Sequence, residues 1–332
     1  MRLRFRFIVV MLFMIGFIII FNGLYTVIET TEDYSVHKQR EQQGTIYLTP
    51  NRAINDAGTT TSPAGLAVNY SQRIVYNRVP KCGSRSVLTL FKIMAVTNKF
   101  RVIEPAMNYP YQLGRNEQKR ISDFMSALRT PFLYHRHMHY FDFKTFGGPS
   151  VAYINLIRDP VSRSVSHFYF RRYGDNLLNK TRVKNKIKNR DMTYDECVLK
   201  KETECVGNWG IFFIVPFFCG HLKECRSPKR WALNQAKKNV EKYLVVGILE
   251  EYDDFIKVLE KLLPNFFQGA YKQSKTPDPY MPPKSVLSLT RKKQKPSEKI
   301  IAMSKENMKL EYEFYDFIKE RFHKLKRSLD IQ

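Results

Sequence analysis

Apolar and polar positions alternate along this chain with two different periods. Short apolar runs rich in β-branched residues, typical of buried strands, occur at RIVYN (73–77), VAYINLI (151–157) and YLVVGIL (243–249). Each is followed by a segment with helical spacing: SRSVLTLFKIMAV, PVSRSVSHFYFRR and EEYDDFIKVLEKLL. This alternation predicts an α/β fold with a central parallel sheet flanked by helices.

A long helix is predicted after Pro296. Its apolar positions, Tyr312, Tyr315, Phe322 and Leu325, recur at helical spacing. A stripe of this kind packs against a hydrophobic core, so we interpret it as structural and not as a cofactor site.

The N-terminus has the pattern of a membrane anchor. Residues 7–28, FIVVMLFMIGFIIIFNGLYTVI, carry no charged side chain and follow Arg2, Arg4 and Arg6. At 1.5 Å per residue such a helix spans a hydrocarbon core of roughly 30 Å. The arginines predict a cytoplasmic tail (1–6), and therefore a type II protein. The alternative, a cleaved signal peptide, would have a shorter apolar region and a small-residue cleavage site.

Residues 29–70 are polar and show no helical or strand period, which indicates a luminal stem. The globular pattern begins at about residue 71 and continues to 328, enough for one well-buried domain. Two sequons, at Asn69 and Asn179, are predicted glycosylation sites and agree with a secretory lumen.

Five cysteines also favour an oxidising compartment. Proximity predicts the disulfides Cys197–Cys205 and Cys219–Cys225, although the sequence allows other connectivities. A zinc site is the alternative, but spacings of eight and six residues are not the short type that zinc sites use. Cys82 is then the odd thiol.

The chain carries 55 Lys and Arg against 31 Asp and Glu, a formal charge of +24. Such an excess indicates a polyanionic partner or an anionic surface, and the membrane anchor argues against nucleic acid. The segment KTRVKNKIKNR (180–190) has a cation at every even position. It is either a solvated loop or a polysaccharide contact.

One predicted strand-to-helix junction has the features of an anion site. The strand ends near Val79 and the helix begins at about Ser84, so the first free N–H groups of the helix converge on one point. Lys81 adds a charge, and Ser84 and Ser86 add hydroxyl donors. In the nucleotide loop GxxxxGK[ST] the lysine adjoins the helix, whereas here Lys81 precedes Gly83.

A second junction follows the strand at 151–157. Arg158 emerges at the carboxyl end of that strand, where open α/β sheets bind ligands. Asp159 and Pro160 suit the cap and first position of the next helix, and Ser166 lies about two turns along it. The alternative is that Arg158 pairs with a nearby acid.

Three alternating histidines, His135, His137 and His139, lie in LYHRHMHYFDF. A strand would put all three on one face. They could supply a general base near neutral pH, form a metal triad, or belong to a half-buried structural strand.

Together these motifs resemble a known enzyme family. PKCGSRS with IRDPVSRSVS is similar to the paired phosphate motifs of sulfotransferases that use 3′-phosphoadenosine 5′-phosphosulfate (PAPS). More closely, YNRVPK, YINLIRDP, YFRRYGD, DEC, PFFCGH, RWAL and EFY, in this order, resemble the Golgi uronyl 2-O-sulfotransferases of glycosaminoglycans. The resemblance implies a PAPS-dependent sulfotransferase fold and transfer of sulfate to a uronic acid 2-hydroxyl.

The resemblance also assigns residues. It implies that Lys81, Cys82, Gly83, Ser84, Arg85 and Ser86 hold the 5′-phosphosulfate, and that Arg158 and Ser166 hold the 3′-phosphate. Lys81 would stabilise the leaving group without a metal. His137 matches the catalytic base, and His135 matches a second histidine of the heparan sulfate branch.

The acceptor is less closely defined. The loop CGSR is more similar to the chondroitin and dermatan sulfate branch, whereas His135 fits the heparan sulfate branch. Arg78, Arg171 and Arg172 are candidates for binding acceptor carboxylates or sulfates. The family also implies a Golgi membrane location and a homotrimer. The rival hypotheses are a non-catalytic receptor for sulfated polysaccharide and a kinase or other P-loop NTPase.

Overall fold

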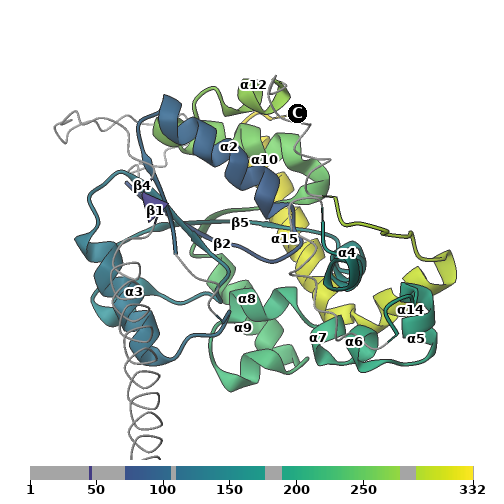
Figure 1. The fold of residues 1–332 in the computed structure, drawn as a ribbon. Helices are drawn as coiled ribbons and strands as arrows, with labels where there is room; N and C mark the ends of the chain where they lie inside the picture. The colour runs from purple at the N-terminus through teal and green to yellow at the C-terminus, as the bar shows by residue number, and fades with distance from the viewer. Residues whose placement is uncertain (1–44, 47–71, 106–109, 176–188, 277–288, 332) are drawn as a thin grey trace, which may run out of the picture. The chain divides into compact units, whose positions relative to one another are not determined.

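The computed structural model describes residues 45–46, 72–105, 110–175, 189–276 and 289–331 (Figure 1). The predicted cytoplasmic tail, membrane span and most of the stem lie outside these ranges, as do Asn69, Asn179 and residues 180–188 of the basic segment. In the ranges that are described, no helix has the length and apolar character needed to cross a bilayer.

The chain divides into two units. One consists of Met1–Ile46 with Glu104–Asn108 and includes the short strand β1 (Thr45–Ile46). The other, Tyr47–Ile103 with Tyr109–Gln332, contains almost all of the described structure and every candidate site residue that the structure describes.

Its centre is a parallel sheet. The strands are β2 (Arg73–Asn77), β3 (Arg101–Glu104), β4 (Phe132–Arg136), β5 (Ala152–Ile157) and β6 (Tyr243–Ile248), in the order β3-β4-β2-β5-β6. Every pairing among them is parallel. The predicted runs at 73–77, 151–157 and 243–249 are therefore confirmed as strands to within one residue at each end.

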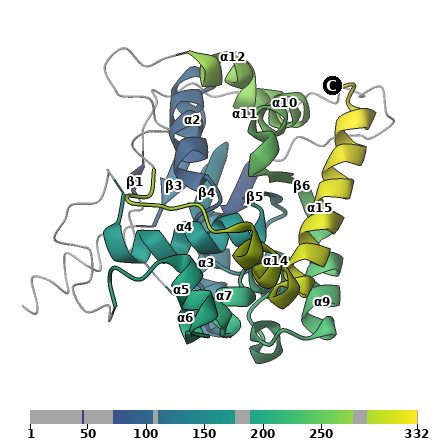
Figure 2. The same cartoon turned by 90° about the vertical axis from the view of Figure 1, so that its right-hand side faces the viewer.

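Helices cover both faces of the sheet, as the α/β prediction requires (Figures 1 and 2). They are α2 (Ser84–Thr97), α3 (Arg115–Ala127), α4 (Pro160–Tyr173), α5 (Tyr194–Leu199), α6 (Thr203–Val206), α7 (Asn208–Ile211), α8 (Ile214–Cys219), α9 (Arg230–Val240), α10 (Tyr252–Leu262), α11 (Pro264–Phe267), α12 (Ala270–Lys275), α14 (Glu298–Asn307) and α15 (Lys309–Ser328). The helix predicted after Pro296 is thus divided in two, at Met308.

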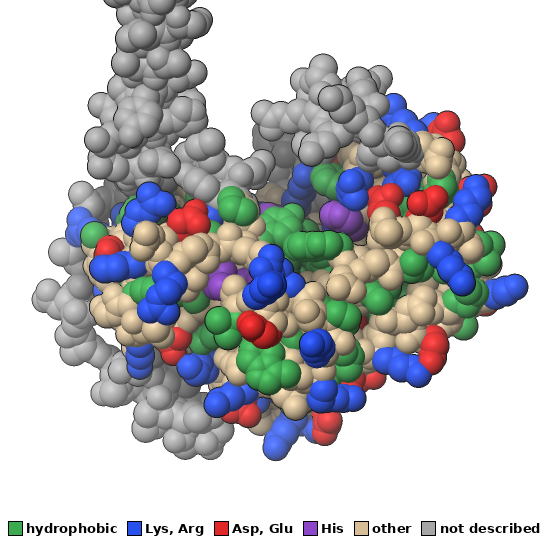
Figure 3. All heavy atoms as spheres, turned by 90° about the horizontal axis from the view of Figure 1, so that it is seen from below, with side chains coloured by type: hydrophobic (Ala, Val, Ile, Leu, Met, Phe, Trp, Pro, Cys, Tyr) green, Lys and Arg blue, Asp and Glu red, His purple; other side chains and the backbone are tan. Residues whose placement is uncertain are grey.

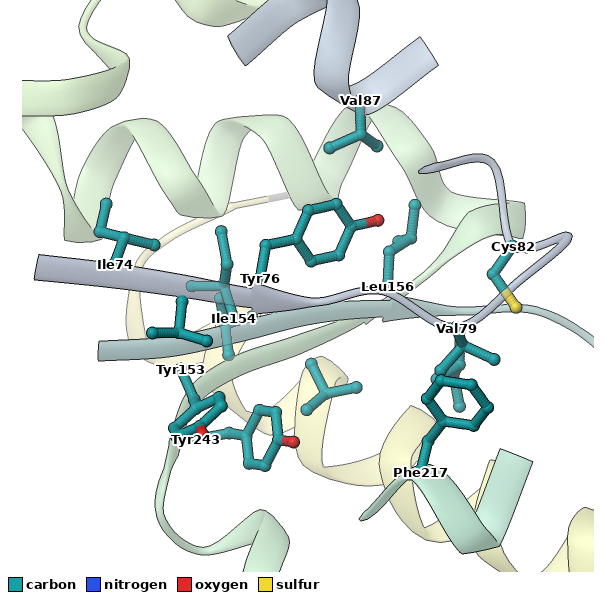
Figure 4. Close-up of a cluster of buried hydrophobic side chains, with 14 of the residues drawn as sticks. Ile74, Tyr76, Val79, Cys82, Val87, Tyr153, Ile154, Leu156, Phe217 and Tyr243 are labelled. Carbon is teal, nitrogen blue, oxygen red and sulfur yellow. The ribbon is translucent and has the colours of Figure 1, made fainter. Parts of the chain in front are cut away.

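The core lies on both sides of the strands because successive side chains alternate between faces. Tyr76 and Val87 lie on the α2 side of the sheet, whereas Tyr153 and Tyr243 lie on the side of α8 (Figure 4). Tyr315 and Phe322 of the predicted stripe are buried in this core. The hydroxyl of Tyr312, by contrast, donates to Asp159 over 2.7 Å, so that position does more than pack.

A buried polar network links the strands to the loop after β4. The Asn155 side-chain amide donates to the backbone carbonyl of Asn77 over 2.7 Å, and Tyr243 donates to the Asn77 side chain over 3.0 Å. The Asn77 amide in turn donates to the carbonyl of Met138 over 3.4 Å. Because buried polar groups need partners, this network fixes the loop that carries His137.

Both predicted disulfides are present, Cys197–Cys205 and Cys219–Cys225. The first joins α5 to α6, and the second joins the end of α8 to the 3₁₀ turn at Lys223–Arg226. Cys82 is the free cysteine and is buried.

Candidate active site

The turn between β2 and α2 has the backbone that an anion site requires. Lys81 and Gly83 both adopt left-handed conformations, with φ of 69° and 74°. A Cβ at Gly83 would lie 2.5 Å from Leu249 Cδ1, so glycine is needed on two counts. The first turn of α2 contains no acidic side chain, which leaves its positive end and free N–H groups available.

Lys81 is half-buried, and its ammonium lies 3.8 Å from the centre of the Phe170 ring. Burial, with smaller contributions from the charges of Arg85, Arg158 and Lys293, lowers the pKa of Lys81 to about 8 against the opposing effect of Asp175. A lysine held among like charges is stabilised when an anion binds between them.

Arg158 follows β5, the neighbour of β2 in the sheet. Both strands run in the same direction, so Lys81 and Arg158 emerge at the same edge, and each is close enough to act on the other electrostatically. Asp159 caps α4 by accepting from the Ser162 N–H over 2.7 Å, with Pro160 at the first turn, as predicted.

The other predicted residues of the turn differ in burial and in their partners. Arg85 is paired with the buried carboxylate of Asp175, and Ser84 is buried at the start of α2. Cys82 is fully buried, and burial raises the pKa of its thiol to about 12. Its side chain is therefore a neutral thiol that faces the core, and only its backbone is placed to bind a ligand.

The segment that begins at residue 289 also contributes residues to this side of the site. The sequence analysis did not identify it. The hydroxyls of Ser166 and Thr290 lie 3.3 Å apart, and Thr290 forms an antiparallel bridge with Asp175. Partial burial and the Arg158 charge lower the pKa of Lys293. The run RKK (291–293) belongs to no recognisable sequence motif. It lies at the site only because the folded chain returns there.

His137 lies beside this cluster, half-buried, on the loop after β4. Its Nδ1 is 2.9 Å from the carbonyl oxygen of Arg78. A carbonyl can only accept, so Nδ1 carries the proton and Nε2 keeps a free lone pair. Burial, followed by the Arg78 charge, lowers the pKa of His137 to about 3, and the imidazole is neutral at physiological pH.

The prediction that one strand would align three histidines is wrong, because β4 ends at Arg136. His135 is fully buried in that strand, with a pKa well below its usual value. His139 Nδ1 donates to the Gly220 carbonyl over 2.8 Å, and its own carbonyl accepts from His221 over 3.0 Å. No group of three His, Cys, Asp or Glu side chains in the described ranges is arranged to hold a metal.

The three candidate acceptor arginines differ. The backbone carbonyl of Arg78 lies 2.9 Å from His137 Nδ1, and the Arg78 charge adds to burial in lowering the pKa of His135 and of His137. Arg171 is half exposed and 3.4 Å from Glu204. Arg172 is buried, and its two terminal nitrogens each donate to Glu204 over 2.9 Å. This bidentate pair gives Arg172 a structural role and leaves it no exposed face for an acceptor.

His167 and Tyr111 were not identified from the sequence either. His167 is half-buried on α4, and burial lowers its pKa to about 3, with contributions from Arg163, Arg171 and Lys81. The Tyr111 ring lies 5.9 Å from His137. Neither residue belongs to a recognisable motif, so only the folded chain shows that they adjoin the site.

Comparison with known proteins finds similar chains. The model of the sulfotransferase family matches residues 65–318. The chain is 37% identical to Uronyl 2-sulfotransferase of Homo sapiens, and of Mus musculus, over 292 residues, which cover 86% of this chain and 70% of each relative. It is 38% identical to Heparan sulfate 2-O-sulfotransferase 1 of Xenopus laevis over 261 residues, covering 75% and 70%.

Proposed function

This chain belongs to the sulfotransferase family, and from that premise we propose that it transfers the sulfuryl group of PAPS to the 2-hydroxyl of a uronic acid in a glycosaminoglycan. The observation that carries this proposal is the convergence of Lys81, Arg158 and a neutral His137 at one edge of the sheet. Two cationic clusters and a base are what such a transfer needs.

The residues present suit the donor. Burial, together with the nearby charge of Arg158, lowers the pKa values of Lys81 and Lys293, and a ligand with phosphate at both ends would stabilise these cations. When bound, PAPS supplies the sulfuryl group. The turn 81–86 would hold its 5′-phosphosulfate, and Arg158 with Ser166 its 3′-phosphate.

Each protein group then has one task. Lys81 stabilises the negative charge that develops as the phosphate leaves. His137 Nε2 accepts the proton of the acceptor hydroxyl, and the Arg78 carbonyl holds the ring in the required tautomer. Asp175 fixes Arg85 beside the turn.

For the acceptor we favour dermatan or chondroitin sulfate over heparan sulfate. The match to Uronyl 2-sulfotransferase covers 86% of the chain, against 75% for Heparan sulfate 2-O-sulfotransferase 1, and the CGSR turn supports the same choice. Disaccharide analysis after incubation with all three polymers tests this. Sulfation of heparan sulfate alone would reverse the assignment.

The cellular setting is also a proposal. We place the catalytic domain in the Golgi lumen as a homotrimer, held by a type II anchor at residues 7–28 and glycosylated at Asn69 and Asn179. The support is the apolar segment with its preceding arginines, the two sequons and the family resemblance. Glycosidase sensitivity and protease protection in sealed Golgi vesicles test it.

The reaction itself is tested with His137→Ala. This variant should lose about 10²- to 10⁴-fold of labelled sulfate transfer, the usual contribution of a general base. It should still bind adenosine 3′,5′-bisphosphate. His139→Ala is the matched control: it removes a structural hydrogen bond, and should lower the melting temperature more than the intrinsic rate.

Three outcomes are distinguishable. Normal turnover by His137→Ala would exclude this residue as the base. Salt-sensitive polysaccharide binding without consumption of PAPS, and indifferent to Lys81→Ala, would favour a non-catalytic receptor. Stabilisation by ATP with magnesium, but not by adenosine 3′,5′-bisphosphate, would favour a kinase or other P-loop NTPase.

A further inference from the structure

A continuous series of aromatic rings leads away from His137. The Tyr111 ring centre lies 5.9 Å from His137 and 6.3 Å from Phe213. Phe213 in turn lies 6.4 Å from Trp209. Neighbouring rings at such distances are in contact, so these side chains form one packed series, which we call the aromatic line (His137, Tyr111, Phe213, Trp209). Phe213 is buried within it.

Trp209 ends this line and is 61% exposed. The helix that carries Trp209, α7, is nevertheless closely packed. A Cβ at Gly207 would lie 2.5 Å from the Thr203 carbonyl oxygen, and one at Gly210 would lie 2.6 Å from that of Glu204. The two glycines thus let α7 press directly on α6, which the Cys197–Cys205 disulfide ties to α5. An exposed tryptophan that is held by rigid surrounding structure is typical of a binding site.

Phe213 is held equally firmly. The buried carboxylate of Glu311 accepts its backbone N–H over 3.1 Å, together with those of Ile214 and Val215. The guanidinium of Arg163 lies 3.9 Å from the centre of its ring. The aromatic line is therefore preorganised along its length.

Positive charge accompanies the rings. Arg163 is 2% exposed, and its Nη1 finds no hydrogen-bond partner among the described residues. Arg163 and Arg171 both act on His167, which lies 5.9 Å from Phe213. On the face drawn in Figure 3, hydrophobic and histidine side chains are visible with Lys and Arg side chains among them. Rings among cations suit a polymer with apolar sugar faces and anionic groups.

We propose that Trp209 forms a remote acceptor subsite, on which a sugar ring of the glycosaminoglycan stacks at a distance from the uronic acid that reacts at His137. This inference rests on the proposed function and extends it to the path of the polymer. The occupant is the acceptor chain, because the aromatic line starts at the proposed base, and Arg163 and Arg171 lie along it.

Acceptors of increasing length test the proposal. Trp209→Ala should raise KM about 5- to 20-fold for a long oligosaccharide, and leave KM unchanged for a trisaccharide centred on the reacting uronic acid. Affinity for adenosine 3′,5′-bisphosphate and the melting temperature should stay at wild-type values. Trp209→Phe, which keeps a ring, should recover most of the loss.

The second tryptophan of the chain is a matched control. Trp231, on α9, is 46% exposed, and no ring contact joins it to the aromatic line in the part of the chain that is described. Trp231→Ala should therefore leave KM unchanged for every acceptor. In Trp231→Phe, Trp209 is the sole tryptophan, and its fluorescence should change on titration with the long oligosaccharide.

The outcomes separate the two proposals. If the wild-type chain transfers no sulfate to any acceptor, the proposed function fails. If it does transfer sulfate, but Trp209→Ala keeps the wild-type KM for long acceptors, only the subsite is overturned. An equal loss for long and short acceptors, with a lowered melting temperature, would make Trp209 structural and also overturn it.

Discussion

A single backbone carbonyl determines what His137 can do. Because the Arg78 carbonyl accepts from Nδ1, the imidazole presents an unprotonated Nε2. His135 and His139, two residues away on either side, have the same side chain but are buried in other surroundings. The alternating pattern suggested three histidines on one face, and only the family resemblance singled out His137. The end of β4 at Arg136 explains why their surroundings differ.

The depressed pKa of Lys81 predicts a pH dependence for donor binding. The lysine is protonated below about pH 8 instead of below its ordinary value near 10.5. Affinity for adenosine 3′,5′-bisphosphate should therefore be level from pH 7 to 8 and fall above it, by at most about tenfold per pH unit, since one proton is coupled. Isothermal titration calorimetry at pH 7 to 9.5 measures this.

Lys81→Arg is the control for that titration, because a guanidinium stays charged throughout this range. Its affinity should be level up to pH 9.5. If the variant loses affinity above pH 8 as the wild type does, another group is responsible.

At the scale of elements, the donor side of the site consists of two junctions, each a strand that runs into a helix on the same edge of the sheet. Local signals predicted both, since Pro80, Gly83, Asp159 and Pro160 are typical of such turns. The short helices α6 and α7 gave no such signal. They have four residues each, too few for helix propensity to stabilise them. The disulfide, the close contacts at the glycines and other tertiary contacts stabilise them instead.

The same limit applies to the site. Lys81, Arg158 and His137 could be predicted because each adjoins a strand end. Thr290 and Lys293 reach the donor edge from a segment more than 120 residues after Ser166 along the chain. No periodicity encodes such a return, so these residues could not be predicted.

Gly83→Ala should impair the first junction. The left-handed φ of 74° costs an alanine about 1 kcal/mol, and the contact with Leu249 adds to this. We expect a destabilisation of about 1–2 kcal/mol and at least tenfold weaker binding of adenosine 3′,5′-bisphosphate. Thermal unfolding and calorimetry measure the two effects.

Gly147→Ala is matched to it. Gly147 has a φ of 72°, but nothing lies within 4 Å of the added Cβ. This variant should lose stability through its backbone alone and keep donor affinity. Equal donor affinity in both variants would contradict the role of the turn at Gly83.

At the scale of the whole molecule, 55 cationic side chains against 31 acidic ones suit an anionic polymer. Many of the described lysines and arginines are in surface ion pairs of small energetic value, such as Lys119–Asp123. Around the proposed donor turn, by contrast, Arg85, Arg158 and Lys293 all act on Lys81. Net charge alone predicted the kind of partner but not where it binds.

Salt should therefore weaken acceptor binding more than donor binding. Between 50 and 200 mM salt, we expect affinity for sulfated polysaccharide to fall about tenfold or more through counterion release. Replacement of the cations at even positions of residues 180–190 by Gln should reduce the slope of log affinity against log salt if that segment touches the polymer. An unchanged slope would mean a solvated loop.

The burial of the Cys82 thiol has a practical consequence. The side chain is fully buried within the donor turn, so a thiol-alkylating reagent can reach it only when that turn opens. Its rate of labelling therefore reports the opening equilibrium directly, and a nucleotide that clamps the turn shut should slow it in proportion to occupancy. Cys82 is thus a native reporter of how often the donor turn opens.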